Sequence, residues 1–264
     1  MPRHRLAALS CALLAAALPA FADDAPAQAQ AKVVHCGHLF DSASGRMLGE
    51  TSIVVRGERI ESVQSGAIPA PAGAEVVELG DATCLPGLID AHTHLTGETS
   101  PTGYSDQFRW NVADYAIRST VYADRTLQAG FTTVRDLADT DYDSVALRNA
   151  INAGIVPGPR IFTAGVPIGS TGGHADPTDG YRQDLAGDPG PKDGIIDSPQ
   201  DAWKAVREHY KNGVDLIKIM PSGGVLDESS SADNPQLTID EVKAIVAAAH
   251  DYGFAVAAHA HGAE

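Results

Sequence analysis

The sequence predicts an α/β fold, namely a (β/α)8 barrel of the TIM type that breaks off after about five strands, preceded by a small all-β unit. Short β-rich runs fill residues 32–82 without any helical stripe. Strands and helices alternate strictly over residues 83–264, and side chains that can bind metals stand at several strand ends. The segment 83–264 is shorter than the ~250 residues of a typical complete barrel, so we expect a partial one.

The first 22 residues are typical of a secretory signal peptide rather than of a folded element. Two arginines precede an apolar stretch, and the sequence AFA that ends at Ala22 is an A-x-A cleavage signal. We expect cleavage after Ala22, export to the periplasm or the medium, and a polar linker at 23–31. The apolar stretch is too short to span a bilayer, so no membrane anchor is expected.

Residues 32–82 predict a small β unit. The Val- and Ile-bearing runs KVVHCGHLF, TSIVVRG, RIESVQ and AEVVEL are separated by turn sequences such as DSASGR and PAPAG. Export would allow Cys36 and Cys84 to form a disulfide. Each cysteine equally suits a small buried apolar position, so both alternatives remain open.

From residue 83 onward the pattern changes to alternating strands and helices. The predicted strands are ATCLPGLIDAHTHL, FTTVRDL, PRIFTAG, VDLIKIM and FAVAAHAHG, and helices are expected at about 111–130, 143–154, 198–213 and 237–253. Helix caps are expected at Ser198, at Thr238 and at Asp143 or Ser144. This alternation implies parallel strands joined by helical crossovers, which suits a doubly wound sheet as well as a barrel.

The ends of the strands carry the candidate chemistry. His92 and His94 are two residues apart on a strand, so they face the same side and can bind one transition metal together. His259 and His261 repeat this spacing at the end of the last predicted strand. The alternative for either pair is two ordinary core or surface histidines.

Lys218 stands in the middle of the hydrophobic strand VDLIKIM. Burying an ammonium without a partner is costly, and a buried lysine loses its proton readily. A neutral amine can then take up carbon dioxide as a carbamate that bridges two metals, whereas the alternative is an ion pair with Asp136 or Asp215. Because barrel strands converge at one mouth and a doubly wound sheet offers only a crevice, these strand ends favour the barrel.

The overall charge excludes some classes of partner. The chain has a formal net charge of −15, whereas a surface for nucleic acid or an anionic membrane would need a basic patch. We therefore expect a small-molecule or dipeptide substrate as the partner, and neither nucleic acid nor a membrane. The sequence leaves the oligomeric state open, a homo-oligomer included.

Four motifs closely resemble the metal-dependent amidohydrolase superfamily, namely LPGLIDAHTHL, GFTTVRDL, IKIMPSGGV and VAAHAHG. The resemblance covers residues 32–264 and is strongest to the branch of imidazolonepropionase-like and Xaa-Pro dipeptidase-like proteins. It implies that residues 32–82 are a β-sandwich portion and that 83–264 are a partial barrel. Lys218 favours the dipeptidase-like enzymes, because imidazolonepropionases use one metal and no such lysine.

The resemblance also implies a binuclear centre, with zinc as the expected metal. His92 and His94 would bind the more buried ion. Carboxylated Lys218 would bridge the two ions, and His259 would bind the second.

Two further histidines are candidate substrate contacts. His174 lies in GSTGGHAD, a loop sequence that also matches this branch of the superfamily. His261 lies one step beyond His259 and would either touch substrate or fill the mouth of the site.

The family pattern continues past the printed sequence, with a metal-binding histidine on the sixth strand and a general-base aspartate on the eighth. No carboxylate up to Glu264 matches that aspartate, so no catalytic residue is assigned. We expect this chain to be an N-terminal portion of the enzyme that is inactive by itself.

The predicted activity of the complete enzyme is hydrolysis of amide bonds in a dipeptide or an N-acyl amino acid. A cyclic-amide hydrolase of the imidazolonepropionase type is the alternative among enzymes. A non-catalytic barrel protein, or the product of a truncated gene, is the alternative from another class.

Overall fold

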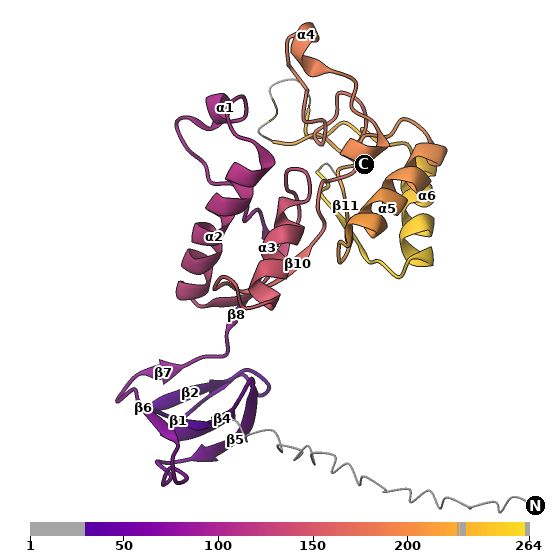
Figure 1. Ribbon diagram of the computed structural model, residues 1–264. Coiled ribbons are helices and arrows are strands. Elements are labelled where there is room, and N and C mark those ends of the chain that lie inside the picture. The colour runs from indigo at the N-terminus through magenta and orange to yellow at the C-terminus, as the bar shows by residue number, and fades with distance from the viewer. Residues whose placement is uncertain (1–29, 226, 228–230, 262–264) are drawn as a thin grey trace, which may run out of the picture. The chain divides into compact units, whose positions relative to one another are not determined.

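Figure 1 shows the computed structural model, which describes residues 30–225, 227 and 231–261. The chain divides into two compact units, one that ends at Leu85 and one that begins at Pro86. The predicted signal peptide, 1–22, and most of the predicted linker, 23–31, lie outside the described residues. Among the helices of the described residues, none is both long enough and apolar enough to cross a membrane.

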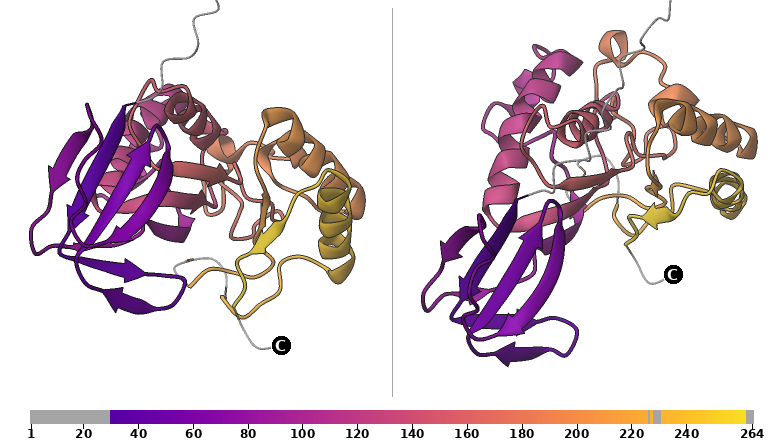
Figure 2. Two further views of the ribbon diagram at one scale, coloured as in Figure 1. Left: turned by 90° about the horizontal axis from the view of Figure 1, so that it is seen from below. Right: turned by 60° about the horizontal axis from the view of Figure 1, so that its bottom comes forward.

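Over its described residues the first unit is all-β (Figure 2), and its larger sheet has the strand order β5-β4-β1-β6. The strands are β1 (Ala31–Cys36), β4 (Thr51–Arg56), β5 (Arg59–Ser65) and β6 (Glu75–Glu78). β1 pairs antiparallel with β4 and parallel with β6, and β4 pairs antiparallel with β5. Side chains alternate between the core and solvent, so Val33 is fully buried while its neighbour Lys32 is exposed.

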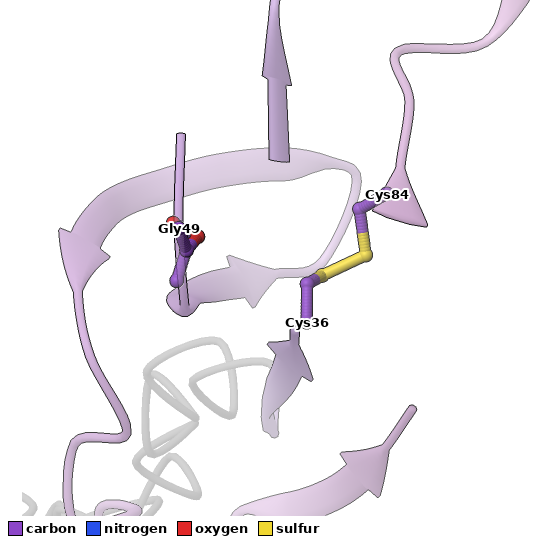
Figure 3. The surroundings of a disulfide bond; sticks show 4 residues. Cys36, Gly49 and Cys84 are labelled. Carbon is purple, nitrogen blue, oxygen red and sulfur yellow. Dashed lines mark hydrogen bonds between the residues drawn. A yellow bond between two sulfur atoms is a disulfide. The ribbon is translucent and has the colours of Figure 1, made fainter. Parts of the chain in front are cut away.

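A second sheet of this unit has the strand order β3-β2-β7. It contains β2 (His38–Asp41), β3 (Arg46–Leu48) and β7 (Thr83–Cys84). β7 pairs with β2, so the two residues that begin the predicted barrel segment are strand partners within the first unit. A disulfide joins Cys84 in β7 to Cys36 at the end of β1 (Figure 3), and it therefore links the two sheets.

In its described residues, the second unit contains five short parallel strands. β8 (Leu88–Thr93), β9 (Phe131–Asp136) and β10 (Arg160–Thr163) form one sheet in the order β10-β9-β8, and β11 (Ile217–Ile219) pairs with β12 (Val256–Ala258). A parallel bridge between Ile168 and Ile219 continues the series from the segment after β10 to β11. The Ile168 amide donates to the Lys218 carbonyl oxygen at 2.8 Å, and the Met220 amide donates to that of Ile168 at 2.9 Å.

In the described part of this unit, four longer helices follow the strands, namely α2 (Val112–Gln128), α3 (Asp143–Asn152), α5 (Pro199–Asn212) and α6 (Ile239–Asp251). The short helices α1 (Gly103–Asp106), α4 (Gln183–Ala186) and η1 (Pro191–Asp193) lie in the longer connections. The predicted alternation of strands and helices is thus confirmed as a mixed α/β fold. No sheet of the described residues closes on itself.

The helix caps follow local sequence at two of three predicted positions. Ser198 accepts a hydrogen bond from the Asp201 amide, and Thr238 forms a capping box with Glu241. The expected cap of α3 is wrong, because this helix begins after Tyr142, whose backbone is left-handed with φ 62°. Ser144, an expected cap, instead directs its amide to the Asp139 carboxylate at 3.1 Å.

The main core of the second unit lies between β11 and the helix pair α5 and α6, which lie side by side in Figure 1. Ile217 and Ile219 of β11 pack there with Val206 of α5 and Ile245 of α6. All four side chains are 3% exposed or less. Since alternate residues of a strand face opposite sides, this packing determines where the residue between the two isoleucines must point.

We expect the Cys36–Cys84 disulfide to stabilise the protein by about 2–4 kcal/mol, because it closes a long loop with a sequence separation of 48 residues. Reduction should lower the urea midpoint of the first unfolding transition. The double variant Cys36→Ala/Cys84→Ala should begin at the lower stability and should not respond to the reductant. Unchanged unfolding of the wild-type protein, with both thiols shown free by titration, would contradict this expectation.

Candidate functional site

The first pair of candidate ligands stands at the end of β8. His92 is in the strand and His94 follows it, and their ring centroids are 5.3 Å apart. Both residues are exposed. Partial burial of its ring, followed by the charge of Lys218, lowers the pKa of His92, which favours the neutral imidazole that can donate a lone pair to a metal.

Asp136, at the end of β9, holds the neighbouring end of β8 in place. Its Oδ2 accepts a hydrogen bond from the Leu95 amide at 2.5 Å and lies 3.4 Å from the Thr93 hydroxyl. The Asp136 side chain is fully buried, and burial raises its pKa to about 7. This carboxyl group ties together the chain on both sides of His94, so we assign it a positioning role that the sequence motif does not reveal.

Lys218 is the residue between the two core isoleucines of β11, so strand alternation directs it away from the core of α5 and α6. It is only 1% exposed. Burial, followed by the positive charge of Arg135, lowers the pKa of its amine. Within the described part of the chain, no carboxylate pairs with Lys218.

The two acids that the sequence offers as alternative partners of Lys218 are engaged elsewhere. Asp215 accepts hydrogen bonds from Arg148 at 2.6 Å and from the Thr163 amide at 2.9 Å. Asp136 accepts the Leu95 amide described above. The structure therefore does not support a simple structural ion pair for the buried lysine.

Arg135 is a residue of this region that sequence reasoning missed. Its Nε donates to the Ala91 carbonyl oxygen at 2.7 Å, and its charge lowers the pKa of both Lys218 and His92. The alternation of FTTVRDL provides the signal, since it puts Arg135 on the strand face opposite buried Val134 and Asp136. A fixed cation here favours neutral Lys218 and would favour an anionic group at the same position.

His259 lies directly after β12 and is at the centre of a second histidine group. Its amide donates to the Ile219 carbonyl oxygen at 2.9 Å, which extends the pairing of β11 with β12. Its ring centroid is 4.6 Å from that of His174 and 4.6 Å from that of His261. His261 is exposed, and its amide donates to the Ser222 hydroxyl at 2.9 Å.

The His259 imidazole has the properties of a free metal ligand. Its Nε2 is buried and has no hydrogen-bond partner among the residues that the structure describes. Burial lowers its pKa, and the charges of His174, Lys218 and His92 lower it further. Lys218 acts electrostatically on both His92 and His259, so it links the two histidine groups.

The donor set fits a divalent metal in its chemistry, but the side chains alone do not form a finished centre. Imidazole nitrogens are common zinc ligands, and the Nε2 atom of His259 is buried without a partner among the described residues. Among the described residues, no group of three or more His, Cys, Asp or Glu side chains is spaced to hold an ion. A further anionic ligand would be needed between the two histidine groups, where Lys218 stands.

His174, the predicted substrate contact, is held by two neighbours. Its Nδ1 lies 2.7 Å from Oδ1 of Asp227, and its amide donates to Gln236 at 2.8 Å. The Gly224 amide donates to Oδ2 of the same Asp227 at 2.7 Å. His174 and Asp227 line a cavity of about 550 Å³. Asp227 was not identified from sequence, because no motif marks a carboxylate that supports a histidine 53 residues away.

We expect Gly224→Ala to displace the His174 ring, because an added Cβ would lie 2.3 Å from its Cε1 and 2.5 Å from its Nδ1. The NMR signals of this imidazole should shift, and the free energy of unfolding should fall by about 1–3 kcal/mol. Gly97→Ala is the control, since nothing lies within 4 Å of a Cβ at Gly97. Unchanged His174 signals in Gly224→Ala would show that the ring does not rest on this glycine.

A buried acid near the start of α3 predicts a pH dependence of stability. Asp143 is 1% exposed, and burial followed by the charge of Asp139 raises its pKa from 3.8 to about 7. The unfolded chain loses this proton near pH 4, whereas the folded chain keeps it up to about pH 7. Stability therefore declines as the pH rises through this window.

Asp143→Asn should remove this penalty and raise the free energy of unfolding by about 2 kcal/mol at pH 8, with a smaller gain at pH 5. Urea titrations at both pH values measure the difference. Asp136, Asp139 and Tyr115 interact electrostatically with Asp143. These three residues are therefore kept the same in the two proteins compared. Asp188→Asn, at an exposed acid, is the control. An equal gain at the two pH values would refute the assignment.

Comparison with known proteins agrees with these features. The model of the Amidohydrolase family matches residues 83–264. Ochratoxinase from Aspergillus niger is 30% identical over 193 residues, which cover 67% of this chain and 39% of ochratoxinase. The chain thus spans well under half the length of this curated relative.

Solved structures of similar proteins extend over both units of the chain. A Xaa-Pro dipeptidase with bound methionine in its active site has a TM-score of 0.84 and 42% identity, over 89% of this chain and 57% of its own. A prolidase complexed with N-methylphosphonate-L-proline has a TM-score of 0.76 and 32% identity, over 88% and 56%. The structure of A. niger ochratoxinase gives 0.74 and 28%, over 89% and 57%. With its family model matched and the resemblance to dipeptidases confirmed, this chain belongs to the amidohydrolase family.

Proposed function

We propose that the protein hydrolyses amide bonds in small molecules and that His92, His94, Lys218 and His259 hold the metal ions of its active site. The observation that carries the proposal is Lys218, a buried lysine without a carboxylate partner among the described residues. Its charge acts on both His92 and His259. The names of the similar proteins, a Xaa-Pro dipeptidase and an ochratoxinase, support amide hydrolysis.

The five parallel strands of the second unit are, in this proposal, part of a (β/α)8 barrel. Four of the candidate residues stand on or directly after β8, β11 and β12. In such barrels the carboxyl ends of the strands surround the active site. The chain covers about half of the dipeptidase structure that it resembles, so the activity proposed is that of the whole protein.

Lys218 is the residue on which the metal site depends. Its neutral amine would add to carbon dioxide, forming a nitrogen–carbon bond and releasing one proton, and would thereby become an anionic carbamate. This carbamate would supply the ligand that the histidines lack, with His92 and His94 on one ion and His259 on the other. Two divalent ions, with zinc as the expected metal, supply Lewis-acid activation of water and of the scissile carbonyl when bound.

The substrate proposed is a dipeptide or an N-acyl amino acid. His174 is the proposed substrate contact, because Asp227 fixes its Nδ1 and leaves the other ring nitrogen for a ligand. His261 is exposed beside His259 and is proposed to contact substrate as well. A two-metal lysine site favours this reading over a one-metal cyclic-amide hydrolase.

We also propose that the protein is exported. The signal-like sequence that ends at Ala22 is the main support. The disulfide between Cys36 and Cys84 is a second support, since structural disulfides persist in oxidising compartments and are rare in the cytosol.

Lys218→Ala should lower both metal content and activity. In the whole protein, purified and given zinc and bicarbonate, this variant should bind fewer ions, and its hydrolysis of Xaa-Pro dipeptides should fall at least about 100-fold. Lys204→Ala, at an exposed lysine of α5, is the matched control. Full metal occupancy and normal turnover in Lys218→Ala would sink the proposed centre.

A further inference from the structure

Two adjoining cavities of the second unit lie beside the candidate site, with volumes of about 550 and about 450 Å³. They share Gln107, Pro177 and Tyr181 in their walls. The Tyr181 hydroxyl donates to the Gln107 side chain and so joins the segment around α1 to the long loop after β10. We call the two cavities together the aromatic groove.

Aromatic rings form much of this groove. Tyr104 and Tyr181 line the larger cavity, and Trp110 and Tyr115 line the smaller one. The rings of Trp110 and Tyr115 are 5.3 Å apart. The Arg118 guanidinium lies 3.9 Å above the ring of Trp110, so one face of this wall already holds a cation.

Carboxylates supply the charge of the groove. Asp176, Asp179 and Asp227 line the larger cavity, and Asp141 lines the smaller one. Among the described residues, the hydrogen bonds that Asp176 accepts come from neutral groups, namely the amides of Gly172 and Thr178 and the Thr178 hydroxyl. Among the described residues, no lysine or arginine lines either cavity.

The groove leads to the proposed active site through His174. This residue lines the larger cavity, and its ring contacts that of His259 at 4.6 Å. A substrate group in the groove would thus lie one side chain away from a proposed metal ligand. Negative charge combined with aromatic rings is the chemistry that attracts an organic cation.

We infer that the aromatic groove is a specificity subsite for a positively charged group of the amide substrate, a protonated amine or a guanidinium. The inference rests on the proposed amide hydrolysis and defines the substrate class. The cation would be either a basic side chain or the free α-ammonium of a dipeptide. The groove would reject substrates with an acidic group at this position.

Matched substrates test the inference and distinguish these two sources. The substrates are dipeptides with lysine, norleucine or glutamate at either position. Norleucine serves as the neutral analogue of lysine because its chain is similar but lacks the ammonium. Each dipeptide is assayed with a free and with an acetylated amino terminus. We expect kcat/KM for the preferred cationic substrate to exceed that of its neutral analogue about tenfold, and the advantage to shrink at high salt. If only acetylation removes the advantage in kcat/KM, the group bound in the groove is the α-ammonium. If only the replacement of lysine by norleucine removes it, the group bound is the basic side chain.

Variants of residues in the groove test whether these residues cause the preference for cationic substrates. Asp179→Asn and Tyr104→Ala should each reduce the cationic preference, which is the ratio of kcat/KM for the cationic substrate to that for the neutral one, by at least about threefold. Asp188→Asn removes an exposed charge from the same loop and should leave the preference unchanged. A preference below twofold in the wild-type protein, or one that survives both groove variants, would overturn the inference.

A binding measurement separates this inference from the proposed function. Nα-acetyl-L-lysine amide, L-norleucine amide and Nα-acetyl-L-norleucine amide are titrated into the wild-type and Asp179→Asn proteins and followed by NMR. The first carries only a side-chain ammonium, the second only an α-ammonium, and the third neither. Tighter binding of either cationic compound than of the neutral one, weakened in Asp179→Asn, supports the groove even if no amide is cleaved and the proposed function fails. Equal binding of all three compounds overturns the inference whatever the activity.

Discussion

The candidate site depends on one packing constraint, which is the burial of Ile217 and Ile219 between β11 and the helices α5 and α6. With these two side chains in the core, the strand turns Lys218 to its other face. There the lysine is buried without a carboxylate partner among the described residues, a state that costs free energy unless the amine becomes neutral or acquires a counter-charge. The neighbouring Arg135 increases that cost by lowering the pKa of the lysine further. A fold rarely keeps such an arrangement for stability alone, because buried unpaired charge is destabilising.

The surroundings of Lys218 are built by parallel pairing. The amide of His259 joins β11 through Ile219, and Ile168 joins the other side of the same strand. These bonds hold the start of the long loop and the end of β12 on either side of β11, and His174 in that loop contacts His259. At β8, Asp136 holds the chain in place, because its carboxyl group accepts a hydrogen bond from the backbone just after His94. Buried polar groups therefore position the histidines from two directions.

The long connection after β10 carries residues of both the candidate site and the aromatic groove. Glycines allow the backbone of this loop to turn tightly. Asp227 and Gly224, from the segment after β11, lie against the His174 ring and hold it in place. Beyond His174 the same loop contributes Asp176, Asp179 and Tyr181 to the aromatic groove. In the proposed function, this loop would therefore contribute both to the active site and to the choice of substrate. In barrels the reactive groups stand at strand ends, and the loops that follow the strands commonly select the substrate.

The sequence by itself determined the alternation of strands and helices, the caps at Ser198 and Thr238, and the family, because these follow from local periodicity, capping chemistry and contiguous motifs. It also identified Lys218, because a single lysine within an otherwise apolar strand can be recognised from the sequence. Only the tertiary structure decided that Cys36 and Cys84 pair, that Asp143 lies within the first turn of α3 rather than capping it, and that Arg135, Asp136 and Asp227 surround the histidines. Each of these depends on contacts between residues distant in sequence or on a left-handed turn at Tyr142, and no local pattern encodes which distant side chain will fill a given space.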